Sequence, residues 1–142
     1  RVQRLFKHMA MHAEVQSHAG MQPGVFILDD EGDVLGEYAE FLELQGLTCR
    51  CETDPRRAVD AVVNDPDIGV VVTDMRMPGL DGWSFIELVS SRLSASRRIS
   101  FIIVTGDDAE CAEARRVGIP VMHKPVDPYS LVEEVRRQCA AC

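Results

Sequence analysis

Five polar side chains that could do chemistry each come after an apolar run of the sequence. They are Asp29, Asp30, Asp74, Thr105 and Lys124, which come after the runs VFIL, IGVVVT, FIIV and IPVM. A carboxylate that directly follows a buried run is costly unless another group compensates its charge. Three carboxylates, a hydroxyl and an ammonium could together bind a cation and hold an anionic group.

The three acids create a charge conflict if the fold brings them together. Carboxylates within a few ångströms of one another cannot all stay ionised without a shifted pKa or a bound cation. Mg²⁺ suits a site that supplies two or three protein oxygens and leaves water positions open. Asp74 then remains usable as a nucleophile that accepts a phosphoryl group as an acyl phosphate. The metal, Lys124 and the Thr105 hydroxyl would neutralise charge on the transferring oxygens.

Five apolar runs alternate with five amphipathic stretches, and these are the elements that must position the polar side chains. Strands are predicted at 25–28, 47–51, 68–73, 101–104 and 119–122, and helices at 34–46, 54–65, 82–93, 107–118 and 127–139. The first, third and fourth runs are continuously apolar, as expected when helices cover both faces of a parallel sheet. The pattern predicts an α/β fold with one parallel sheet of five strands, (βα)₅. For a doubly wound sheet of this size we expect the strand order 2-1-3-4-5.

This topology places the five polar side chains along one edge. In an open parallel sheet, functional groups gather at the carboxyl ends of the strands. Strands one and three are neighbours in the predicted order, so Asp29 and Asp30 should face Asp74 across a few ångströms.

Local signals mark several boundaries. Asp54 is an expected N-cap with Pro55 at the first helical position, and Gly46 is expected to end the preceding helix. Asp81-Gly82 is expected to shape a turn rather than to do chemistry.

Length and composition favour one domain in residues 24–139, with 1–23 as a linker, an extra helix or a cloning remnant and 140–142 as a tail. Of the 142 residues, 46% are hydrophobic and 27% are charged. The net charge of −8 disfavours direct nucleic-acid binding, which needs a basic face. No window approaches the roughly 18 apolar residues of a membrane span, so no membrane insertion is expected.

The five cysteines are odd in number and show no zinc-binding spacing. We expect ordinary reduced thiols in a cytoplasmic protein.

Four signals stand in a recognisable order along the chain. An acidic pair follows strand one, the pattern D-x-x-M-P-x-x-D-G reads DMRMPGLDG at 74–82, Thr105 follows strand four, and Lys124-Pro125 follows strand five. This arrangement resembles the receiver domain of two-component response regulators, over about residues 24–139. The resemblance implies a flavodoxin-like fold.

By this resemblance Asp74 looks like the phosphoacceptor, with Thr105 and Lys124 in contact with the phosphoryl group. The Lys124–Pro125 bond is then expected to be cis.

The resemblance also implies a Mg²⁺ site. Asp30 would be the main ligand beside Asp74, Asp29 would act through water, and the backbone carbonyl of Arg76 would complete the set.

The function implied is a switch that takes a phosphoryl group from a phosphohistidine of a histidine kinase or phosphotransfer protein. Such a domain catalyses only its own phosphorylation and dephosphorylation and is not a metabolic enzyme. The face that changes on phosphorylation, here called the reporting face, would be formed by helix 107–118, strand 119–122 and helix 127–139. That face could serve a homodimer or an output domain of the same chain.

Two alternatives are weighed against this interpretation. A phosphoaspartate hydrolase typically needs a second acid two residues after the nucleophile, where this chain has Arg76. A degenerate receiver would act only as a docking module, although all five active-site side chains are present. GIPVMHKPV resembles receivers attached to hybrid sensor kinases, so two classes stay open: a regulator with an output module, or a receiver within or beside a kinase.

Two further features of the sequence bear on how the site would work: a departure from the family pattern and a pair of opposite charges. Receivers commonly carry Tyr or Phe three residues before the lysine, where this chain has Val121, whose branched side chain has few rotamers. Arg76 and Asp107 should flank the mouth of the site. We expect them to pair there, hinder the attacking water and lengthen the phosphorylated lifetime.

Overall fold

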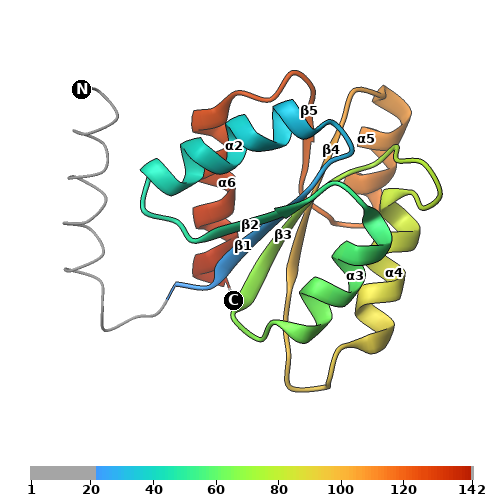
Figure 1. The fold of residues 1–142 in the computed structure, drawn as a ribbon. Helices are drawn as coiled ribbons and strands as arrows, with labels where there is room; N and C mark the ends of the chain where they lie inside the picture. Colours follow the sequence, from blue (N-terminus) through green and yellow to red (C-terminus); the bar gives the residue numbers. More distant parts are fainter. Residues whose placement is uncertain (1–21, 142) are drawn as a thin grey trace.

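All five predicted strands are present and form one parallel sheet in the order β2-β1-β3-β4-β5 (Figure 1). The computed structural model describes residues 22–141. The strands are β1 (Gly24–Leu28), β2 (Cys49–Glu52), β3 (Ile68–Asp74), β4 (Ser100–Thr105) and β5 (Val121–His123). The predicted strand order is therefore confirmed. The prediction for residues 1–23 lies almost wholly outside the described residues.

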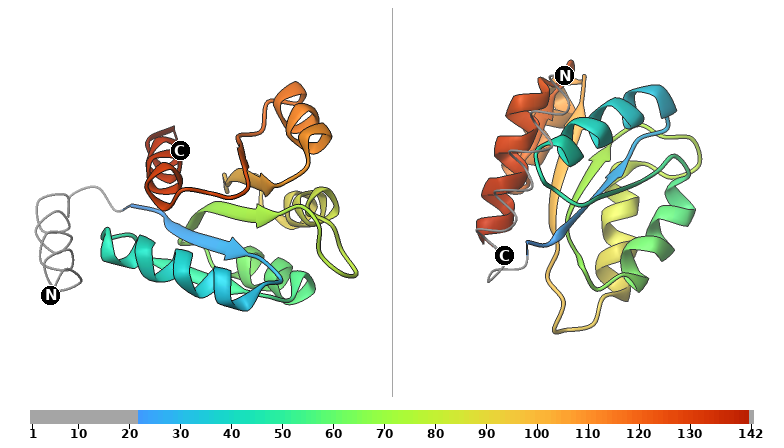
Figure 2. Two further views of the ribbon diagram at one scale, coloured as in Figure 1. Left: turned by 90° about the horizontal axis from the view of Figure 1, so that it is seen from above. Right: turned by 60° about the vertical axis from the view of Figure 1, so that its left-hand side comes forward.

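Five described helices connect and follow the strands. They are α2 (Gly32–Leu44), α3 (Pro55–Asn64), α4 (Gly82–Arg92), α5 (Asp108–Arg116) and α6 (Pro128–Ala141). In the right-hand view of Figure 2, α2 and α6 lie on one side of the sheet, and α3 and α4 lie on the other. No helix in the described part of the chain has both the length and the apolar character needed to cross a membrane.

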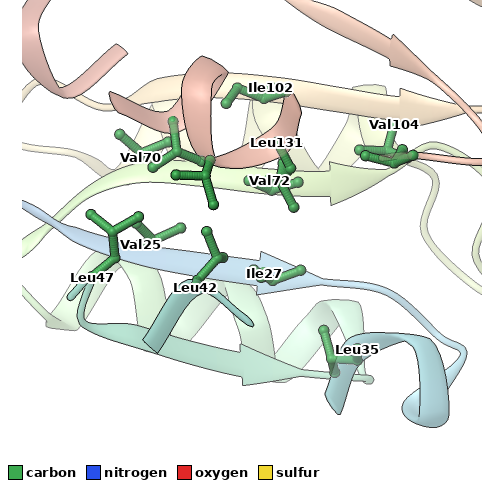
Figure 3. Packing of buried hydrophobic residues seen from close by; sticks show 13 residues of the cluster. Val25, Ile27, Leu35, Leu42, Leu47, Val70, Val72, Ile102, Val104 and Leu131 are labelled. Carbon is green, nitrogen blue, oxygen red and sulfur yellow. The ribbon is translucent and has the colours of Figure 1, made fainter. Parts of the chain in front are cut away.

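Alternation along the central strands divides the core into two layers. Val25 and Ile27 of β1 pack with the helices α2 and α6, and Figure 3 shows this cluster. Phe26 and Leu28 point to the opposite face and pack with α3 and α4. Because successive strand residues point to opposite faces, a strand buried on both sides must be apolar throughout. This is why the first, third and fourth runs lack polar interruptions.

The helix boundaries follow their local signals. The Asp54 side chain accepts a hydrogen bond from the backbone N–H of Arg56 at 2.9 Å, and Pro55 opens α3. Gly46 has φ of +87°, the left-handed conformation that ends α2. Both predicted signals are confirmed.

Two strands begin two residues later than predicted: β2 covers Cys49–Glu52, where 47–51 is expected, and the other is the shorter strand β5. It covers only Val121–His123, where 119–122 was expected. Proline has no N–H for the ladder, so the regular strand begins after Pro120. The Pro120 carbonyl still accepts from the backbone N–H of Ile103 at 2.9 Å.

Among the described cysteines, Cys49, Cys51 and Cys111 are free thiols. Burial raises the pKa of Cys49 to about 12, so this thiol stays protonated at neutral pH. These observations agree with the expectation of ordinary thiols.

Replacing Arg97 by alanine should destabilise the fold. Its guanidinium donates to the carbonyl oxygens of Val62, Val63 and Ile68 at 2.9–3.1 Å, and so ties the end of α3 to the start of β3. Removing the donors leaves these partly buried carbonyls unpaired, which should lower the free energy of unfolding by about 1–3 kcal/mol. Urea denaturation measures the change. Arg98→Ala, at the exposed neighbouring position, is the matched control, and an equal loss in both variants would contradict the prediction.

Candidate functional site

The predicted polar side chains meet at the carboxyl edge of the sheet. Asp29 directly follows β1, Asp74 ends β3, and Thr105 ends β4; all three are buried, with exposed fractions of 4%, 6% and 2%. Lys124 directly follows β5. The parallel order of the strands brings their carboxyl ends to the same edge, as predicted.

The three acids form one cluster. Asp29, Asp30 and Asp74 each offer a carboxylate oxygen, and these atoms lie within 4.8 Å of one another. Asp29 is further fixed because its Oδ1 accepts the backbone N–H of Glu31 at 2.9 Å. Several carboxylate oxygens at this separation, with one member of the cluster exposed to solvent, fit a hard divalent cation that keeps some of its water.

Lys124 supplies the positive charge nearest to the two buried acids. Its Nζ lies 3.1 Å from Asp74 Oδ1 and 3.9 Å from Asp29 Oδ2. The backbone N–H of Lys124 donates to the Thr105 carbonyl at 2.9 Å, which places the lysine beside the end of β4. The Lys124–Pro125 peptide bond is cis, as predicted.

Two opposing effects set the pKa values of the cluster: burial and the charges of neighbouring groups. Burial raises the pKa of both Asp29 and Asp74, and the Lys124 ammonium only partly offsets this effect. Burial works to lower the pKa of Lys124, but the hydrogen bond and charge of Asp74 outweigh it, so the pKa is raised. One ammonium is thus insufficient to compensate the acids, which leaves room for further positive charge.

The loop after Asp74 depends on a glycine. A Cβ on Gly82 would lie 2.9 Å from the Asp74 carbonyl oxygen and 3.0 Å from the Met75 Cα, closer than real Cβ atoms approach. The backbone N–H of Gly82 donates to the Met75 carbonyl at 2.8 Å. The side chain of Asp81 caps α4 by accepting from the Ser84 N–H at 2.8 Å. The Asp81-Gly82 pair therefore shapes the turn, as predicted.

The expected pairing of Arg76 and Asp107 is present. Arg76 Nη2 lies 2.7 Å from Asp107 Oδ2. The Nε of Arg76 also donates to Glu110 Oε2 at 3.1 Å, a contact that was not predicted. Arg76 therefore bridges the loop after β3 to the start of α5.

Glu110 is the residue of this region that the sequence interpretation missed. Its Oε1 accepts the hydroxyl of Thr105 at 2.5 Å. The signal that could have found it is spacing: an acid in the first turn of the helix, five residues after the strand-end threonine, can reach back to that strand end. Val121, the other position noted in the sequence, packs half-buried against the cluster of Met75, Ile103 and Ala114.

A cavity of about 360 Å³ opens at this edge of the sheet. It is lined by residues of four segments, most of them charged: Asp30, Glu31, Asp74, Arg76, Thr105, Gly106, Asp107 and Lys124. The carboxylate of Asp74 therefore faces a space in which an anionic group could meet Lys124 and a cation.

Comparison with known sequences gives a family match. A sequence model described as the response regulator receiver domain matches residues 25–136. The two-component response regulator PprB of Pseudomonas aeruginosa is 35% identical over 116 residues, which are 80% of this chain and 42% of PprB. The transcriptional regulatory protein FixJ of Azorhizobium caulinodans is 32% identical over 115 residues, which are 79% of this chain and 53% of FixJ. The chain thus spans about half the length of these relatives.

Solved structures show the same fold. A crystal structure of FixJ-N is 25% identical, with a TM-score of 0.72, and the match covers 87% of this chain and 98% of that one. The receiver domain of Francisella response regulator 1452 is 20% identical, with a TM-score of 0.73, and the match covers 84% of this chain and 98% of that one. These likenesses confirm the predicted five-stranded α/β fold.

Proposed function

This chain belongs to the receiver-domain family of two-component response regulators, and from that premise we propose that Asp74 accepts a phosphoryl group from a phosphohistidine of a partner protein. The observation that carries the proposal is the position of Asp74 at the end of β3. There its carboxylate faces the cavity, 3.1 Å from the Lys124 ammonium and beside two further acids. The donor would be a histidine kinase or a phosphotransfer protein.

The transfer is a single displacement at phosphorus. A carboxylate oxygen of Asp74 attacks the phosphorus atom, and the bond from phosphorus to the imidazole nitrogen breaks with its electron pair left on nitrogen. The product is an acyl phosphate on Asp74, and hydrolysis by water returns the carboxylate and releases phosphate. The domain is therefore a signalling switch that modifies only itself.

Lys124 and Thr105 have distinct roles in this proposal. The Lys124 ammonium pairs with Asp74 in the free protein and with a phosphoryl oxygen after transfer, so positive charge stays where negative charge develops. The Thr105 hydroxyl, at the end of the neighbouring strand, would donate to a second phosphoryl oxygen. Both groups are held by backbone contacts between the ends of β4 and β5.

The acid cluster fits Mg²⁺. We propose Asp30 and Asp74 as direct ligands, Asp29 as a ligand through water, and the backbone carbonyl of Arg76 as a further donor. When bound, the cation would supply positive charge against the transferring oxygens. The geometry in favour is the 4.8 Å grouping of the three carboxylates, whose charge Lys124 alone does not balance.

The reporting face is proposed to be α5, β5 and α6. Phosphorylation adds roughly two negative charges at the edge where β4 and β5 end, and Thr105 and Lys124 stand at those two strand ends. Pairing with a second copy, or docking on an output domain, is the proposed use of this face. Residues 24–139 are the proposed extent of the domain, and the cytoplasm is its proposed location.

The names of these two relatives bear on the two functional classes. PprB is named a response regulator and FixJ a transcriptional regulatory protein, and each extends well beyond the matched region. These names support a regulator with an output module over a receiver within a kinase. The assignment to the first class stays a prediction. The docking-module alternative is weakened because Asp29, Asp30, Asp74, Thr105 and Lys124 all meet at one edge.

The direct test is incubation with Mg²⁺ and acetyl phosphate, followed by intact-mass measurement. A gain of one phosphoryl group on the wild-type chain supports the proposal, and no gain under conditions that modify another receiver contradicts it.

Arg76→Ala should shorten the lifetime of the phosphorylated state. The Arg76–Asp107 pair stands at the mouth of the cavity and limits the approach of water to the acyl phosphate. Because an exposed pair is worth at most about 1 kcal/mol, we expect hydrolysis to be faster by up to about fivefold. The loss of phosphoryl mass over time measures the rate. Arg92→Ala, which breaks the Arg92–Asp60 pair on the helices α4 and α3, is the control, and an unchanged rate in Arg76→Ala would contradict the hypothesis.

A further inference from the structure

The Thr105 hydroxyl, which the proposed transfer needs as a donor, is already hydrogen-bonded to Glu110. The hydroxyl of Thr105 donates to Glu110 Oε1 at 2.5 Å. Threonine has one O–H to donate, so this hydroxyl cannot at the same time donate to a phosphoryl oxygen on Asp74. The Glu110 carboxylate and a phosphoryl group are therefore competitors for one proton donor.

Burial makes this hydrogen bond strong. Thr105 is 2% exposed and the side chain of Glu110 is 22% exposed, so water competes weakly for either group. Hydrogen bonds to an ionised acceptor are shorter and stronger than those between neutral groups, and 2.5 Å is in their range. The backbone N–H of Asp107 donates to the Thr105 hydroxyl oxygen at 3.1 Å, which fixes that oxygen further.

Glu110 is itself held from its other side. Its Oε2 accepts from Arg76 Nε at 3.1 Å, and its backbone N–H donates to Asp107 Oδ1 at 3.0 Å. Arg76 also pairs with Asp107, so the guanidinium spans both acids. Each carboxylate oxygen of Glu110 thus has a partner, and the side chain is kept in the orientation that receives the Thr105 proton.

We propose that Glu110 is a positioning residue that holds the Thr105 hydroxyl away from Asp74 until a phosphoryl group is present. This inference rests on the proposed function of Asp74. The phosphoryl group must outcompete the Glu110 carboxylate, so Glu110 lowers the affinity of the site for it. Glu110 lies in the first turn of α5, and loss of its bond to Thr105 removes a tie between the end of β4 and that helix. The state of Asp74 is thereby transmitted to α5 without a side-chain rearrangement at Val121.

The test measures binding of beryllofluoride, a mimic of the phosphoryl group, in the presence of Mg²⁺. The chain contains a single tryptophan, Trp83, which packs half-buried against the cluster of Met75 and Ile103 and supplies the fluorescence signal. Glu110→Ala removes the competing acceptor, and we expect the Kd for beryllofluoride to fall about tenfold. Glu113→Ala is the matched control, because it removes an exposed acid of the same helix that pairs with Arg116.

A second variant separates the effect of the hydrogen bond on the Kd from the effect of losing the negative charge. Glu110→Gln removes the same charge as Glu110→Ala but keeps an oxygen that can accept from Thr105. The proposal expects its Kd to lie between those of the wild type and Glu110→Ala, a fall of about threefold. Equal Kd values in the two variants would show that charge alone acts and would overturn the proposal. The glutamine retains the size of the side chain, so if the alanine variant does not fold, an unchanged Kd in Glu110→Gln would contradict the proposal.

The methyl ¹³C resonance of Thr105 in the ligand-free protein gives an independent readout. We expect it to shift in Glu110→Ala, because the hydroxyl loses its partner, and to stay unchanged in Glu113→Ala. Beryllofluoride binding to the wild type with an unchanged Kd in Glu110→Ala would overturn this inference alone. If the wild type bound no beryllofluoride at all, the proposed function itself would fail, and the inference with it.

Discussion

Asp74→Asn should lose phosphorylation almost completely, with the rate from acetyl phosphate and Mg²⁺ reduced by at least about a hundredfold. The amide nitrogen and oxygen of asparagine are poor nucleophiles, so no acyl phosphate can form at this position. The substitution is nearly isosteric, and the asparagine Oδ1 can still accept the backbone N–H of Met75, which now donates to Asp74 Oδ1 at 2.9 Å. Intact-mass measurement after incubation gives the result directly.

The control for Asp74→Asn is Asp60→Asn, an exposed acid on α3 that pairs with Arg92. It carries the same change of charge far from the carboxyl edge, and its phosphorylation should match that of the wild type. Peptide mapping of the wild type should place the added group on the segment that contains Asp74. Full phosphorylation of Asp74→Asn would show that another residue is the acceptor and would end the proposal for this site.

Mg²⁺ should stabilise the folded chain through the acid cluster. A ligand at a hundredfold excess over its Kd contributes about 2.7 kcal/mol, which corresponds to a rise of about 10 °C in Tm for a domain of this size. The double variant Asp29→Asn, Asp30→Asn should lose most of this rise, because two of the three clustered carboxylates are removed. Thermal unfolding with and without Mg²⁺ measures both effects.

The control is a second double variant, Asp60→Asn, Glu113→Gln, which removes two exposed acids elsewhere and should keep the full rise in Tm. A rise in Tm that is the same in both double variants would contradict binding of the ion at the cluster.

The double variant Asp29→Asn, Asp30→Asn should also change how the free energy of unfolding depends on pH in the absence of metal. Burial raises the pKa of Asp29 above its ordinary value, so its protonated form is favoured by folding. Its contribution to stability is present below the unfolded pKa of about 3.9 and is lost as the pH rises through the folded pKa. Asparagine at position 29 does not titrate, so the double variant does not lose this stability as the pH rises. Its stability relative to the wild type should therefore grow as the pH rises through that window, which urea titrations at several pH values would show.

The arrangement of the sheet could be predicted because burial on both faces leaves a simple signature. VFIL and IGVVV are apolar throughout, and in the structure their alternate residues pack into separate layers on the two faces. Strand β5 was placed two residues too early, because the run IPVM has the composition of a strand but Pro120 cannot donate to the ladder. Apolar composition locates a buried segment, whereas hydrogen-bond donors determine where the regular strand begins.

The candidate site was predictable where it follows from topology. Asp29, Asp30 and Asp74 were expected to meet because neighbouring parallel strands end at one edge, and their oxygens lie within 4.8 Å of one another. The pairing of Arg76 with Asp107 was expected from opposite charges at two facing loops, and it is present at 2.7 Å. These inferences needed only the order of the strands and the types of the residues that follow them.

The sequence by itself determined which segments form strands, the acids that follow those strands and the loop signals at Asp54 and Gly46, because each depends on residue type and local spacing. Only the tertiary structure decided which acceptor takes the Thr105 hydroxyl, and it is Glu110 rather than a group in the cavity. Arg76, from a loop more than thirty residues earlier in the chain, orients that carboxylate. Spacing along the chain places Glu110 within reach of the end of β4. The direction of the Thr105 hydroxyl depends in addition on a side chain from a distant loop, through contacts of 2.5–3.1 Å that only the folded chain brings about.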